Sequence, residues 1–123
     1  MAVTSAYRDF VLEQLGRVAP VTSRAMFGGV GIYSDGLFFG LMDNDTLYLK
    51  VNDGNRGAFE AEGLAPFTYD GKGRTIVLPY WRVPERLFDE PEEMTVWARA
   101  ALAAARRVAA KKKSKLKSGR ARR

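Results

Sequence analysis

Acidic and basic residues occupy different parts of this chain, and their separation limits which residues can form a folded core. All fourteen Asp and Glu residues precede Met94, whereas ten of the twenty Lys and Arg residues follow Ala105. A segment with many like charges and few large apolar residues cannot bury enough surface to fold by itself. We therefore predict a domain over residues 1–105, with a formal charge of −4, and a disordered basic tail over residues 106–123, with a charge of +10.

The composition supports a folded core but lacks several reactive residue types. Hydrophobic residues make up 46% of the chain and aromatic residues 11%, which excludes disorder of the whole chain. The chain has neither Cys nor His, so disulfides, Cys-based zinc sites and the usual nucleophile–base pairs are excluded. Neither a signal peptide nor an apolar run of about 20 residues is recognisable. We expect a cytoplasmic protein without cofactor, metal or membrane contact.

Apolar spacing and turn residues predict an α+β fold. A helical stripe from Tyr7 to Val18, capped by Thr4 or Ser5, ends before Pro20. Two hairpins are expected at Asp35-Gly36 and at residues 70–73, because Asp-Gly favours tight turns. Asp53 is expected to cap a short helix that Gly63 ends, and Pro91 opens the last helix. The predicted order is α-β-β-β-α-β-β-α, in a two-layer sandwich whose antiparallel sheet has its helices on one side.

The first hairpin has a predicted register that makes both faces of the sheet apolar. With Ser34 opposite Leu37, the regular alternation places Gly31 opposite Gly40 and leaves a trough in the sheet surface. The next strand, residues 47–51, joins the Tyr33/Phe38 face if its loop has two or four residues, and the other face if the loop has three. Because helices cover one face well, we expect the other to form a homodimer or to bind a protein partner.

Several patterns resemble catalytic or ligand-binding motifs, and each has a simpler structural explanation. Asp43 and Asp45 have the spacing found in aspartate phosphatases, but Leu47 stands where those enzymes need Thr or Val, so a hairpin tip is favoured. Residues 28–31 lack the third glycine and the helix of a dinucleotide site, which favours glycines that relieve crowding at a strand. The other acids suit helix surfaces: Asp9, Glu13, Asp53, Glu60 and Glu62. We expect no enzymatic activity.

Aromatic residues in the second half of the chain suit core packing better than base stacking. Tyr69, Tyr80 and Trp81, with Arg82, are of types that stack on bases in nucleic-acid-binding proteins. In a domain this small, aromatic residues are more often needed for the core and for cross-strand pairs. We therefore assign these residues to packing.

The run Arg24-Ala25-Met26-Phe27-Gly28-Gly29-Val30-Gly31-Ile32-Tyr33, followed by Asp35-Gly36 and Phe39-Gly40-Leu41, resembles the start of the TfoX/Sxy N-terminal domain. Later segments fall in the matching order, namely residues 47–50, 66–69 and 80–84, so that the resemblance covers about residues 4–107. The positions that carry it as a family motif are Arg24, Met26, Phe27, Gly28, Gly29, Gly31, Tyr33, Gly36, Trp81 and Pro84.

The resemblance implies an antiparallel α+β domain and supplies no catalytic residues. The best-known members of this family regulate bacterial natural competence as coactivators with the cyclic-AMP receptor protein, so a transcription factor of that type is the implied partner. Those members carry a second, helical C-terminal domain. In this chain a lysine- and arginine-rich segment occupies its place.

Together, these observations favour a non-enzymatic regulatory or adaptor protein with a tail that binds nucleic acid without sequence preference. The alternative is an oligomeric interaction module whose tail only aids solubility. The expected phosphate-binding residues are the ten basic residues of the tail: Arg106, Arg107, Lys111, Lys112, Lys113, Lys115, Lys117, Arg120, Arg122 and Arg123.

Overall fold

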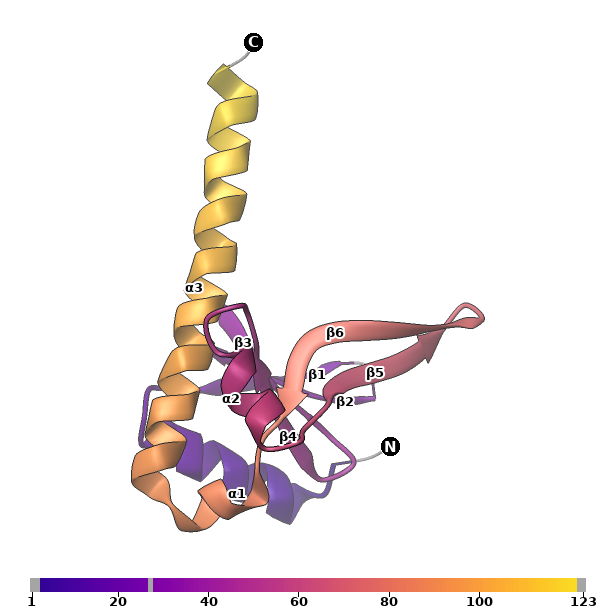
Figure 1. Ribbon diagram of the computed structural model, residues 1–123, viewed down its shortest axis with the longest axis vertical. Coiled ribbons are helices and arrows are strands. Elements are labelled where there is room, and N and C mark those ends of the chain that lie inside the picture. The colour runs from indigo at the N-terminus through magenta and orange to yellow at the C-terminus, as the bar shows by residue number, and fades with distance from the viewer. Residues whose placement is uncertain (1–2, 27, 122–123) are drawn as a thin grey trace.

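The computed structural model describes the backbone of residues 3–26 and 28–121, and the side chains of these residues as far as residue 112. Within these residues the chain forms three α-helices, one 3₁₀ helix and a curved sheet, arranged as in Figure 1. In chain order the elements are α1 (Ser5–Gly16), β1 (Thr22–Met26), β2 (Gly29–Ser34), β3 (Leu37–Asp43), β4 (Thr46–Lys50), α2 (Arg56–Ala61), β5 (Pro66–Gly71), β6 (Arg74–Arg82), η1 (Glu85–Asp89) and α3 (Pro91–Ala121).

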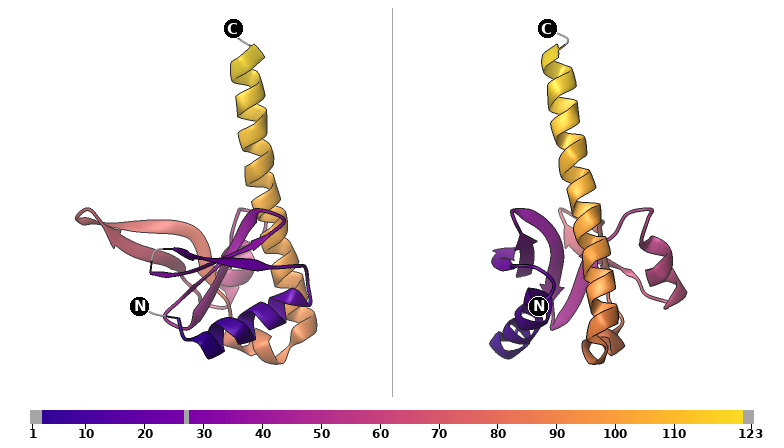
Figure 2. Two further views of the ribbon diagram at one scale, coloured as in Figure 1. Left: turned by 180° about the vertical axis from the view of Figure 1, so that it is seen from behind. Right: turned by 90° about the vertical axis from the view of Figure 1, so that its left-hand side faces the viewer.

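The six strands form one antiparallel sheet in the order β1-β2-β3-β4-β6-β5. The helices cover one face: α3 crosses the sheet over β3 and β4, with α1 and α2 on either side of it (Figure 2, right). The predicted α+β class is therefore confirmed. The β5–β6 hairpin extends beyond the body, away from α3 (Figure 1).

The structure adds strand β1 to the predicted order. Its residues are mostly exposed and show no apolar alternation, so the sequence carries little strand signal there. Pairing with β2 makes it a strand, with Arg24 opposite Gly31 and Ala25 opposite Val30. The helical turn expected after Pro84 is present as η1.

The predicted register of the first hairpin is wrong beyond its second residue pair. Tyr33 lies opposite Phe38 as expected, but Ile32 lies opposite Gly40, so that Phe39 is an extra residue in β3. Such a β-bulge shifts all later pairs by one and changes the face to which each later residue points. Gly31 and Gly40 are therefore not opposed, and the expected glycine trough does not exist.

The bulge also decides where the next strand places its apolar residues. The β3–β4 loop has the two residues Asn44 and Asp45, a length that predicts the Tyr33/Phe38 face for the strand that follows. After the bulge, however, Leu47 and Leu49 pack with Phe39 in the main core beneath the helices. The expected face was derived from unbroken alternation and is therefore wrong for this strand.

The main core lies between the sheet and the helices. Each of the layers contributes completely buried side chains, among them Leu15 of α1, Phe39 of β3, Phe59 of α2 and Ala98 of α3. The side chain of Trp97, 9% exposed, packs edge-on against Phe59 with ring centroids 4.7 Å apart. Burial of aromatic rings of this size contributes several kcal/mol to folding and fixes α2 against α3.

Helix ends follow local signals, with one exception. The Thr4 hydroxyl accepts a hydrogen bond from the Tyr7 backbone N–H and caps α1, as predicted. The N-cap of α2 is Asn55 instead of Asp53. The Asn55 side chain holds the preceding turn: its oxygen accepts from Asn52 N–H at 2.7 Å, and its amide donates to the Lys50 carbonyl at 2.9 Å. Gly63, with φ of +73°, follows the helix as expected.

Helix α3 continues through the segment that the charge pattern predicts to be a disordered tail. Its 31 residues span about 46 Å at 1.5 Å per residue, and its C-terminal part extends beyond the sheet (Figure 1). Ala105 is the last buried residue among those whose side chains are described. Alanine and lysine are good helix formers, and a helix already nucleated on the core adds residues at low free-energy cost. Basic residues also suit the negative end of the helix dipole.

Replacing Gly29 with Ala should destabilise the fold, because the added Cβ would overlap the carbonyl oxygen of Met42 on the neighbouring strand. We expect a loss of about 1–3 kcal/mol in the free energy of unfolding, measured by urea titration. Gly57→Ala provides the control: a Cβ there meets no atom within 4 Å, and the residue lies within α2. This control should be neutral or stabilising by up to about 1 kcal/mol. Equal stability of the Gly29→Ala variant and the unmodified protein would contradict the close approach of the two backbones.

Candidate functional site

The aspartates with a phosphatase-like spacing are part of a tight turn. Asn44 and Asp45 have φ of 50° and 51°, which is the left-handed conformation that a two-residue hairpin needs. The Asp45 carboxylate accepts hydrogen bonds from the Thr4 backbone N–H at 2.8 Å and from the Thr4 hydroxyl at 3.1 Å. Asp45 therefore joins the start of α1 to the β3–β4 turn, as expected of a structural residue at a hairpin tip.

The glycines of the family motif allow close approaches within the sheet. Gly28 has φ of +78°, in the turn between β1 and β2. Gly29 leaves room for the Met42 backbone, and a Cβ on Gly31 would lie 2.6 Å from the methyl carbon of Met26. These distances agree with the prediction that the glycines relieve crowding. The atoms that approach Gly29 and Gly31 belong to Met42 and Met26 of neighbouring strands.

Other motif positions are also occupied by packing or turn residues. The Arg24 guanidinium lies 5.6 Å from the Tyr33 ring, which stacks on Phe38 at 5.1 Å. Gly36 has φ of +77° in the β2–β3 turn, and Pro84 is the N-cap of η1. Trp81 packs edge-on against Phe59 at 6.3 Å. The motif thus specifies this sheet and its turns, and Phe27 lies outside the described residues.

The carboxylates considered for acid–base chemistry lie on the surface beside arginines. The ion pairs are Asp9 with Arg8 at 3.4 Å, Glu13 with Arg17 at 3.4 Å, Asp53 with Arg56 at 2.9 Å and Glu62 with Arg86 at 2.6 Å. Glu60 is exposed on α2. In four pockets lined by described residues, none of these acids lies beside a second carboxylate.

Arg86 is the centre of an ionic network that fixes η1 between α2 and α3. Its guanidinium donates to Glu62, Glu90 and Glu93, and Glu93 also accepts from the Trp97 indole N–H at 3.3 Å. The hydrogen bonds from Arg86 hold the pKa of Glu93 below its ordinary value. These groups are satisfied by one another, so the network is structural.

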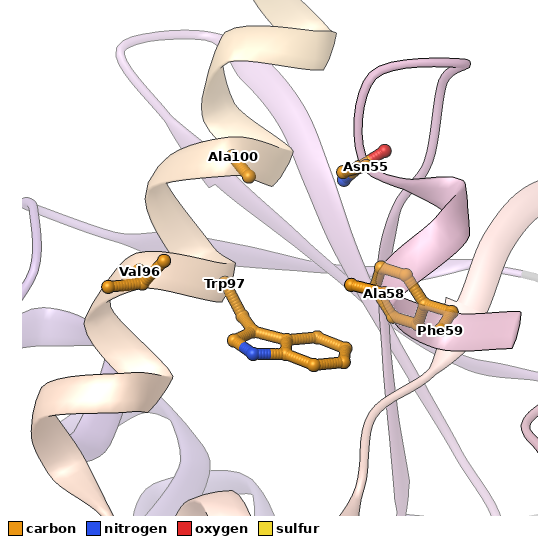
Figure 3. A pocket seen from close by; sticks show the side chains of 6 residues that line it. All are labelled: Asn55, Ala58, Phe59, Val96, Trp97 and Ala100. Atoms are coloured by element: carbon orange, nitrogen blue, oxygen red, sulfur yellow. The ribbon is translucent and has the colours of Figure 1, made fainter. Parts of the chain in front are cut away.

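A small pocket lies between α2 and α3, and Figure 3 shows its lining. The Trp97 indole extends from α3 toward the Phe59 ring, and Ala58 and Ala100 complete an almost entirely apolar wall. The volume is about 80 Å³, well below the roughly 300 Å³ at which ligand pockets usually start. This pocket is a packing gap, and the Asn55 side chain in its lining is already bonded to the backbone of Asn52 and Lys50.

The face of the sheet opposite the helices carries a second apolar cluster, which we call the open-face cluster. Its buried centre is formed by Leu41, Phe67 and Tyr80. The Tyr80 hydroxyl donates to the Phe38 carbonyl at 3.1 Å, and burial raises the pKa of this phenol. Around this centre lie half-buried residues: Met26, Phe38, Tyr48, Tyr69 and Leu78. The prediction that Tyr69 and Tyr80 serve packing agrees with this arrangement, and Trp81 lies on the helix side.

The basic residues of α3 are exposed as far as their side chains are described. Arg106, Arg107, Lys111 and Lys112 follow the last buried turn of the helix. The other predicted phosphate-binding residues lie beyond the described side chains, although α3 continues to Ala121. One basic residue that was not predicted from the sequence, Lys50 of β4, lines a groove together with Lys112. The sequence offers no signal for this pairing, because 62 positions separate the two residues.

A cluster of acidic side chains would indicate a metal site, and a long apolar helix would indicate a membrane-spanning segment. In the described part of the chain, no group of three or more Asp and Glu side chains is arranged to hold a metal ion. Within the same residues, no helix combines the length and the apolar character needed to cross a lipid bilayer.

Comparison with known proteins identifies the family of the chain. None of the curated proteins compared with this sequence matches it. The family model of the TfoX N-terminal domain matches residues 13–105, which include the six strands and end at Ala105, the last buried residue among the described side chains of α3. With most of its length matched, and with the motif residues in the sheet and its turns, the chain belongs to the TfoX N-terminal domain family.

Proposed function

We propose that this protein is a non-enzymatic regulatory or adaptor protein of the cytoplasm, in which the exposed part of α3 binds the phosphate backbone of nucleic acid. The observation that carries the proposal is the distribution of charge along α3. The helix begins with Glu92 and Glu93 beside the body, and from Arg106 to its end at Ala121 it contains eight basic residues and no acid; the sequence then continues with two further arginines. A regular, acid-free helix of this kind is typical of backbone-binding segments.

The rest of the molecule supports a binding role that does not depend on base sequence. The body has a formal charge of −4 over residues 1–105, so its net charge opposes the approach of nucleic acid. The segment from residue 106 to 123 has no aromatic residue to stack on bases. Phosphate contacts fix position and orientation without reading sequence. A partner protein would then have to supply specificity, as expected for a coactivator of competence-type genes beside a transcription factor of the cyclic-AMP receptor type.

Salt dependence tests the role of the basic segment. The intact protein should bind duplex DNA with an affinity that falls steeply with salt. The log–log slope should approach about −9 if all ten charges engage and be smaller if fewer do. A variant ending at Ala105 keeps the core and should lose this binding, as measured by fluorescence anisotropy between about 50 and 200 mM salt. Equally tight binding by the shortened protein, or salt-insensitive binding by the intact one, would contradict the proposal.

A second candidate function, an oligomeric protein-interaction module, is favoured by the open-face cluster. Five half-buried apolar or aromatic residues surround its centre, on the face opposite the one where the main core lies beneath the helices. The exposed part of α3 borders this cluster at Phe38 and Tyr80. Exposed apolar surface of several hundred Å² usually marks a contact with another protein. We propose that this face forms a homodimer or binds the partner protein. In this second candidate function, the basic part of α3 only increases solubility.

Substitution on the open face tests this alternative. Leu78→Lys places a charge in the open-face cluster, whereas Val77→Lys changes the neighbouring residue, which is 62% exposed. Successive strand residues point to opposite faces, so this pair is a matched control. We expect sedimentation to show a dimer for the unmodified protein and for Val77→Lys, and a monomer for Leu78→Lys. A monomeric unmodified protein at hundreds of micromolar would exclude the homodimer.

A further inference from the structure

A groove of about 280 Å³ lies between α3 and the first hairpin, where the helix leaves the sheet. Phe38 and Tyr80 of the sheet form one wall, and Val108 of α3 lies across from them. Lys50, at the end of β4, and Lys112, on the exposed part of α3, both line the groove. The groove is therefore located at the junction between the acidic body and the basic part of α3.

The two lysines are held near each other without a compensating acid. No carboxylate is among the described residues that line the groove. The Lys50 ammonium lies 5.0 Å from the centre of the Tyr80 ring, a cation–π contact that orients it toward the groove wall. Burial, and in addition the charge of Lys112, lower the pKa of Lys50. Two ammonium groups in this arrangement repel each other, and an anion between them would remove the repulsion.

We propose that the groove binds a phosphodiester group of nucleic acid between Lys50 and Lys112. This inference rests on the proposed binding of nucleic acid by α3 and extends it to a residue of the acidic body. A nucleic-acid strand that runs along the basic side of α3 toward the β-sheet would reach the groove at Lys112, which lies one helical turn after Val108. Lysine binds phosphate as a compact charge with three donors, so two lysines can contact separate oxygens of one group.

The aromatic wall has a specific effect on such a contact. The Phe38 and Tyr80 rings pack with centroids 4.7 Å apart, and the Tyr80 hydroxyl is already bonded to the Phe38 carbonyl. This wall offers no free hydroxyl from Tyr80 and keeps water away from one side of Lys50. An ion pair formed beside it is less screened than one made farther along the exposed helix. Lys50 thus fixes the position at which nucleic acid meets the body.

Removal of a single charge tests the groove. Lys50→Gln should reduce the log–log salt slope for duplex DNA by about 0.9, which corresponds to one phosphate contact. Lys72→Gln removes the same charge from the exposed β5–β6 turn and should leave the slope unchanged. Lys50→Arg should retain the contact. Thermal melting of each variant shows whether it is folded, and equal slopes for the Lys50→Gln and Lys72→Gln variants would overturn the proposal.

Lysine acylation read by mass spectrometry gives a second measurement on the unmodified protein. Duplex DNA should protect Lys50 from acylation and leave Lys72 reactive. Unprotected Lys50 in a protein that binds DNA would overturn the groove contact while leaving the role of α3 intact; absence of DNA binding by the intact chain would overturn both. Protection by a mononucleotide, or by an acidic peptide such as polyglutamate, but not by duplex DNA would also overturn the proposal, because the occupant would then be a free phosphate compound or an acidic protein segment.

Discussion

The bulge at Phe39 is the feature on which the two faces of the sheet depend. It adds one residue to β3, so that Phe39 and the next residue both lie on the helix side: Phe39 packs in the main core, and a Cβ on Gly40 would lie 3.4 Å from Ile32 of the same core. From Gly40 onward the alternation is reversed relative to β2, which places Leu41 on the open face and Leu47 and Leu49 in the main core. A single extra residue therefore gives both layers their apolar side chains.

Helix α3 has two roles along one continuous element. Its first half packs on β3 and β4 and contributes Met94, Ala98 and Ala101 to the core. The small alanine side chains let the helix lie close to the sheet, and the Arg86 network fixes its start. The same element then leaves the sheet as an acid-free helix (Figure 2, left). Because the first half is held by the core, the direction of the second half relative to the sheet follows from the fold.

The family motif describes a scaffold, and the proposed binding residues lie elsewhere. Gly29 and Gly31 permit close packing within the sheet, while Tyr33 and Trp81 pack against other aromatic rings. Lys50, Lys112 and the remaining basic residues of α3 are outside that motif. Membership of the family thus accounts for the sheet and its turns. The proposed contacts with nucleic acid are made instead by the basic residues of α3 and by Lys50.

The sequence alone determined the local features: a cap for α1 at Thr4 or Ser5, the turns at Asp35-Gly36 and at residues 70–73, the start of α3 at Pro91, and the separation of charge. Each depends on residues within a few positions of one another, for which backbone preference is sufficient. The tertiary structure decided the bulge at Phe39, the pairing of exposed β1, and the meeting of Lys50 with Lys112. These depend on strand pairing and helix docking between distant segments, where the free energy of packing exceeds local preference and leaves no periodic signal in the sequence.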